Sequence, residues 1–124
     1  MSSALQPEAQ LASIVKAITD LDDLVRLTLG GLSRAKPWQR QLAAALADVD
    51  RRAQVLRMTI VMERSDDELL AASDDLITSC RRAASALGGS RADRVTLTSL
   101  RLVTELAEKI RALLKCQDCH LPTS

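Results

Sequence analysis

The chain of 124 residues has the length of a single domain that can bury a sizeable core. Its 17 basic and 16 acidic side chains give a formal net charge of +1, which argues against attraction to nucleic acid or to an anionic membrane surface. Trp38 is the sole aromatic residue, so the core must consist of aliphatic side chains and Met, a composition that favours packed helices over a β-sandwich.

A first helix is predicted over residues 8–30, after a flexible tail at residues 1–7. Apolar residues recur there at steps of three and four, the spacing that lines one face of a helix. They are Leu11, Ile14, Ile18, Leu21 and Val25. The pair Gly30 and Gly31, followed by Pro37, marks the end of this helix.

A second helix, predicted over residues 37–63, carries two apolar stripes. Pro37 suits the first turn, where an amide hydrogen would have no partner inside the helix. The main stripe continues the same rhythm through Trp38, Leu42, Leu46, Val49, Ala53, Leu56 and Ile60. The second stripe lies beside it in the C-terminal half of the helix and comprises Val55, Met58, Val61 and Met62.

A third helix is predicted over residues 66–87. Ser65 and Glu68 form a capping box, in which the Ser65 hydroxyl accepts from the amide three residues on and the Glu68 carboxylate accepts from the Ser65 amide. Gly88 and Gly89 end the helix. Its apolar face comprises Leu69, Ala72, Leu76, Cys80, Ala83 and Leu87.

A fourth helix is predicted over residues 92–118, with Ser90 or Thr96 as its cap and a frayed tail at residues 119–124. Its apolar seam comprises Leu100, Val103, Ala107, Ile110 and Leu114. Four helices of similar length, joined by short connections, predict an all-α fold: an antiparallel, up-down-up-down four-helix bundle over residues 8–118.

The end of the fourth helix carries the pattern C-x-x-C-H, formed by Cys116, Cys119 and His120. On a continuing helix these side chains share one surface, as covalent haem attachment requires: two thiols add to the vinyl groups and an imidazole reaches the iron. A four-helix bundle with this motif near its C-terminus resembles the cytochrome c′ family, over the architecture and these five residues. The resemblance implies one covalent haem c inside the bundle, with Cys116 and Cys119 as thioether sites and His120 as the axial ligand. It also implies electron transfer or gas binding in the periplasm.

Two other interpretations of the same residues stay open. Cys116, Cys119 and His120 form three zinc ligands if Asp118 or a second chain supplies the fourth. Alternatively, the three residues belong to a solvated, weakly ordered C-terminus without a ligand. We favour this last interpretation, and therefore expect neither a cofactor nor a metal.

No constellation of residues predicts an enzyme. The only His lies near the C-terminus, without the nucleophile pattern of a hydrolytic triad. The aspartate pairs at residues 22–23, 66–67 and 74–75 are interpreted as helix caps and solvent-exposed charges. Neither a secretory signal nor a transmembrane segment is expected, and an odd number of Cys residues favours a reducing compartment. We therefore expect a cytoplasmic protein.

The second stripe is the feature that predicts a function. Under one hypothesis both stripes of the second helix are buried inside the same bundle. Under the other, the second stripe docks a partner helix, a setting in which adaptable Met side chains are common. The preferred prediction is a non-enzymatic interaction module, an adaptor or a subunit of a larger assembly, that binds a partner helix or itself through Val55, Met58, Val61 and Met62. The c-type haem bundle is the alternative.

Overall fold

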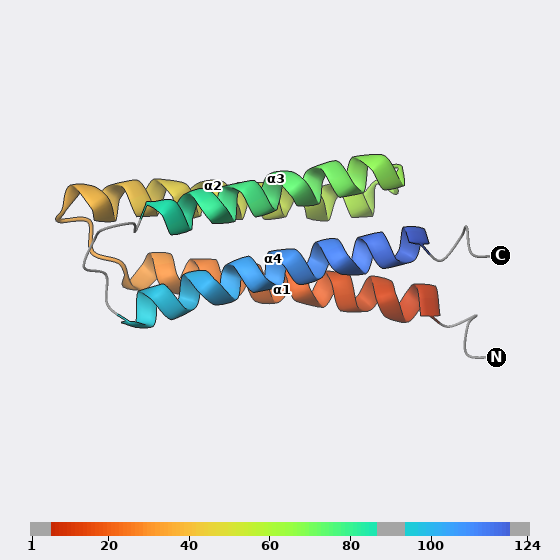
Figure 1. Cartoon of the computed structure of the whole chain (residues 1–124), viewed down its shortest axis with the longest axis horizontal. Helices are drawn as coiled ribbons and strands as arrows, with labels where there is room; N and C mark the ends of the chain where they lie inside the picture. The colour runs from red at the N-terminus through yellow and green to blue at the C-terminus, as the bar shows by residue number, and fades with distance from the viewer. Residues whose placement is uncertain (1–5, 87–93, 120–124) are drawn as a thin grey trace.

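Four helices run back and forth along one long axis in the computed structural model of the chain (Figure 1). The structure describes the backbone of residues 6–86 and 94–119, and the side chains of residues 10–86 and 94–115. The helices are α1 (Gln6–Gly31), α2 (Pro37–Val61), α3 (Asp66–Ser85) and α4 (Arg94–Cys119). The predicted ranges 8–30, 37–63, 66–87 and 92–118 differ from these bounds by no more than two residues at any end.

The helices form a closed ring of antiparallel neighbours. Helix α1 packs on α2 and α4, and α3 packs on the same two helices. The colour gradient in Figure 1 shows that successive helices run in opposite directions, so the start of α1, the α2–α3 turn and the end of α4 lie at one end of the bundle. The all-α four-helix bundle predicted from the sequence is therefore confirmed.

The main apolar stripes predicted from the periodicity form one core. Its central members contribute from all four helices and are fully buried; the largest are Ile14, Ile18, Leu21, Leu42, Leu46, Leu56, Leu76 and Ile110. Trp38, Ile60 and Leu69 pack against this core while partly exposed. The predicted Leu87 lies outside the described residues.

Leu11 corrects the predicted face of α1, because its side chain is 42% exposed. The Thr19 hydroxyl accepts a hydrogen bond from Arg57 Nη2 at 3.4 Å, which sets the register between α1 and α2. Val61 lies four residues beyond Arg57 and is the last residue of α2. Leu11 lies eight residues before Thr19, so in this antiparallel pair it lies beyond the last residue of α2 rather than along the helix, which accounts for its exposure.

The turn between α2 and α3 is defined by local hydrogen bonds. Glu63 adopts a positive φ of 52°, which ends α2 two residues earlier than predicted. The predicted capping box is present: the Ser65 hydroxyl accepts from the Glu68 amide at 3.3 Å, and Glu68 Oε1 accepts from the Ser65 amide at 3.4 Å. These bonds place the end of the second stripe next to the acidic first turn of α3.

Candidate functional site

The second stripe lies on the outer surface of the bundle. Val55, Met58, Val61 and Met62 are 49%, 54%, 66% and 58% exposed, whereas the main stripe of the same helix is buried from Leu42 to Leu56. Since each helical residue advances by about 100°, Val55, Met58 and Met62 project opposite to the buried face. The core is complete without these four side chains, which leaves an apolar surface on α2.

The apolar surface continues onto α1. In the register set by Thr19 and Arg57, Val61 and Val15 each lie one turn toward the same end of the bundle. Val15 is 40% exposed, and Leu11 lies one further turn along. We missed Val15 in the sequence, although its spacing of four residues from Leu11 marks a short apolar line beside the main face of α1.

Basic charge gathers at the start of the second stripe. Arg51 Nη1 and Arg52 Nε lie 3.6 and 3.7 Å from the same Asp48 Oδ1. The other oxygen of Asp48 accepts a hydrogen bond from the Ser79 hydroxyl of α3 at 2.6 Å. Two guanidinium groups thus share one carboxylate at this end.

Acidic charge gathers at the opposite end of the second stripe. Glu63, Asp66 and Asp67 are exposed, and within the described part of the chain no ion pair is made by any of them. Arg64 instead pairs with Glu68 at 3.1 Å. The second stripe therefore runs from a basic end to an acidic end.

Asp22 on α1 faces Asp50 on α2 inside the bundle, close to this surface. Asp22 is only 4% exposed, which corrects its interpretation as a solvent-exposed charge. Burial raises the pKa of Asp22 to about 6, and the hydrogen bond and the negative charge of Asp50 add to this effect, against the positive charges of Arg26 and Arg57. One buried oxygen of each carboxyl has no hydrogen-bond donor. The proton that Asp22 takes up as pH falls through about 6 supplies a donor at this contact.

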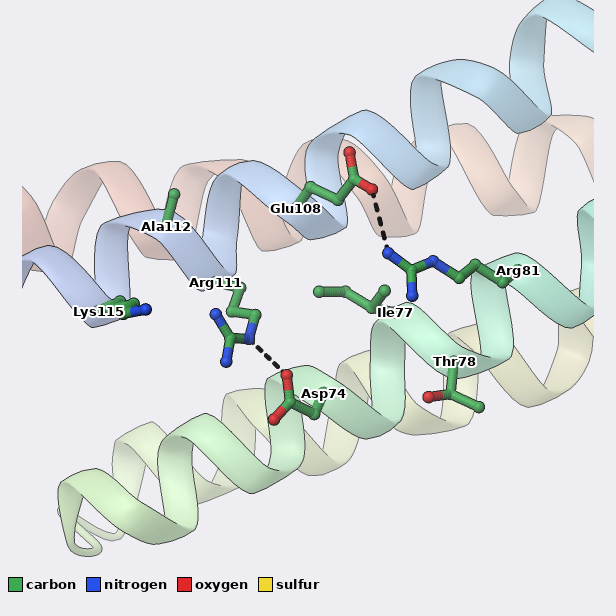
Figure 2. A pocket seen from close by; sticks show the side chains of 8 residues that line it. All are labelled: Asp74, Ile77, Thr78, Arg81, Glu108, Arg111, Ala112 and Lys115. Atoms are coloured by element: carbon green, nitrogen blue, oxygen red, sulfur yellow. Dashed lines mark hydrogen bonds and ion pairs between the residues drawn. The ribbon is translucent and has the colours of Figure 1, made fainter.

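A groove of about 540 Å³ lies between α3 and α4 (Figure 2). Two ion pairs cross it: Arg111 with Asp74, and Arg81 Nη2 with Glu108 Oε2 at 3.6 Å. Each of these two guanidinium groups faces a carboxylate, so Lys115 is the lining cation that makes no ion pair within the described residues. The walls of the groove are polar at the rim, and only Ile77 contributes a large apolar side chain.

The residues of the C-x-x-C-H motif fall at the edge of what the structure describes. Helix α4 includes the backbone of Cys116 and Cys119, whereas their side chains and His120 lie outside the described residues. The haem and zinc interpretations of Cys116, Cys119 and His120 therefore stay predictions. In the described ranges no three His, Cys, Asp or Glu side chains lie together as a metal site.

Cys80 is the remaining thiol, and it is a core residue. It is buried on α3, as its position on the apolar face predicted. Burial raises the pKa of the Cys80 thiol to about 12, with a further contribution from the negative charge of Glu108. A thiol with this pKa stays protonated at neutral pH and packs as a small apolar group.

No protein-family model matches the chain, and searches of curated proteins and of solved structures give no match. Among the described helices none has the length and apolar character needed to cross a membrane.

Proposed function

We propose that the chain is a non-enzymatic helical interaction module, an adaptor or a subunit of a larger assembly, that docks a partner helix or a second copy of itself through the second stripe. The exposure of Val55, Met58, Val61 and Met62, each about half or more, carries this proposal. Contiguous apolar side chains that a complete core leaves outside are typical of protein-protein contact sites. Flexible Met side chains fit such surfaces because they adapt their shape to a partner.

The surroundings of the second stripe support docking of a helix. The stripe extends for about two turns along α2, with Leu11 and Val15 of α1 beside its far end. A shallow apolar line on a rigid helical scaffold matches the anchor spacing of an amphipathic helix laid against it. We place this module in the cytoplasm, where the buried free thiol of Cys80 stays reduced.

The test combines Met58→Glu with Met62→Glu in the full chain. Circular dichroism should show the same helicity as the parent, since the exposed side chains add little to the core. The control is Leu102→Glu, which introduces one such negative charge at an apolar side chain of α4 that is 44% exposed. A photo-crosslinking amino acid at position 58 should trap an adduct in the native host, and mass spectrometry identifies it. The same group at position 102 should trap none.

Unfolding of the Met58→Glu, Met62→Glu chain would show that the second stripe belongs to the core. Equal crosslinking at positions 58 and 102 would show that the stripe has no specific partner. Either result would contradict the proposed function.

A further inference from the structure

We infer that the occupant of the second stripe is the second stripe of another copy of this chain, packed antiparallel about a two-fold axis near Met58. This inference rests on the proposed function and names its partner. A two-fold contact pairs the same patch on both copies, so the patch must be complementary to itself. The distribution of charge along α2 meets this condition.

The charges at the two ends of the second stripe are opposite in sign. Arg51 and Arg52 precede Met58 on α2, whereas Glu63 and Asp66 follow it, in the turn after Val61 and at the start of α3. An antiparallel pair centred on Met58 therefore brings Arg51 and Arg52 of one copy to the acidic end of the other, twice by symmetry. A parallel pair would instead place like charges together, which is unfavourable.

The edges of the helix fit the same arrangement. Arg52 lies on the side of α2 that faces α3, since its partner Asp48 also binds Ser79 of α3. Glu63 lies in the turn between α2 and α3, three residues before α3 begins. A two-fold axis that lies in the contact plane and is perpendicular to α2 keeps the same edge of each helix together. Arg52 of one copy therefore lies toward the α2–α3 turn of the other, which carries Glu63.

Both the charge and the size of the surface favour a reversible dimer. The formal net charge of +1 leaves little long-range repulsion between copies. The apolar contact consists of the second stripe with Leu11 and Val15 at its margin, which is smaller than the interface of an obligate dimer. We therefore expect dimerisation that depends on protein concentration.

Sedimentation equilibrium of the full chain, from micromolar to millimolar concentration, tests the inference. The parent should convert from monomer to dimer, and the chain with Met58→Glu and Met62→Glu should stay monomeric. Arg51→Glu with Arg52→Glu should raise the dissociation constant of the dimer about tenfold or more, because each change acts twice. Glu63→Lys with Asp67→Lys should do the same. Leu102→Glu is the control and should leave the dimer unchanged.

Mixing the two charge-reversed chains gives the sharpest result. A dimer of either charge-reversed chain with itself places like charges together at both ends. In a mixed dimer, the new Glu side chains of one chain face the new Lys side chains of the other at one end. At the other end, the original Arg side chains face the original carboxylates. An equimolar mixture should therefore recover the dimer affinity of the parent. Circular dichroism of each variant checks that the bundle is intact.

Three results would overturn the inference: a parent chain that stays monomeric at all concentrations, a dimer whose dissociation constant does not change with the charge reversals, or a mixture that does not recover the dimer affinity of the parent. None of them affects the proposed function, which fails only if the second stripe is part of the core or traps no specific partner. The two failures are thus distinguishable.

Discussion

Asp22 shows how one buried side chain affects the stability of the whole bundle. Its carboxyl lies between α1 and α2, facing Asp50 and Arg57 across the contact and Arg26 on its own helix. The pKa of Asp22 is about 6 in the folded chain, above the ordinary value of 3.8 that applies when the chain unfolds. Folding therefore favours the protonated form, and the stabilisation from this proton is complete below the unfolded pKa and is lost as pH rises through about 6.

We predict that Asp22→Asn raises the free energy of unfolding at pH 7 by on the order of 2 kcal/mol, because the amide needs no proton to be neutral. Urea unfolding of the parent and the variant at pH 7 and pH 5 measures this effect. The advantage of the variant should shrink at pH 5, where Asp22 of the parent is largely protonated. Asp23→Asn, on the exposed side of the same turn, is the control and should show no such difference. An advantage that is equal at both pH values would contradict the assignment of the raised pKa to Asp22.

Leu46 tests the core at the same scale. Its side chain is 0% exposed at the centre of α2, so Leu46→Ala should leave a cavity and lower the free energy of unfolding by about 2–5 kcal/mol. The comparison is Leu102→Ala, where the side chain is 44% exposed and the expected loss is below about 1 kcal/mol. Urea unfolding of both variants measures this difference. Similar losses in the free energy of unfolding at the two positions would contradict the placement of Leu46 in the core.

At the scale of helices, the sequence predicts bounds well because each helix combines a three-four apolar rhythm with clear end signals. The Ser65–Glu68 capping box fixes the start of α3, and the seam from Leu100 to Leu114 is buried along its whole length in α4. Periodicity identifies the buried face of a helix but not its neighbours. For this reason the rhythm predicts a core position for Leu11, whereas its exposure depends on where α2 ends, which only the packed structure reveals.

The two stripes of α2 show the same limit more clearly. Their residue types are equally apolar, so the sequence left open whether both are buried. The packing of the four helices leaves the second stripe exposed, because α2 contacts α1 and α3 and its outer face has no neighbouring helix among the described residues. The burial of Asp22 likewise cannot be predicted from the sequence, because an aspartate beside another aspartate is typical of a solvated helix surface, and the facing Asp50 is distant in sequence.

The end of α4 provides a separate prediction about the C-x-x-C-H motif. We expect natively produced protein to have the intact mass of the bare chain and no Soret absorption, because the motif falls where α4 ends rather than along the bundle core. Truncation after Lys115 should then change the melting temperature little. A covalent pigment that disappears with Cys116→Ala and Cys119→Ala, and whose spectrum changes with His120→Ala, would instead support the haem interpretation.

At the scale of the whole molecule, the residues that stabilise the bundle and the residues proposed to bind a partner lie on different faces of α2. The main stripes of four helices meet in one core, and the polar contact of Asp22 with Asp50 lies inside the α1–α2 contact. The second stripe lies outside this core, with opposite charges at its two ends. Substitutions in the second stripe should therefore change association while leaving folding nearly unaffected, and substitutions in the main stripe should do the reverse.

Methionine oxidation tests this separation most directly. Met58 and Met62 become sulfoxides at rates that follow their exposure to peroxide, and peptide mass spectrometry follows each residue. In the dilute, folded chain both should be oxidised nearly as fast as in the unfolded chain, and in the assembled form both should be protected. Slow oxidation of Met58 and Met62 in the dilute folded chain would place the second stripe in the core, and equally fast oxidation in the assembled form would show that nothing docks there.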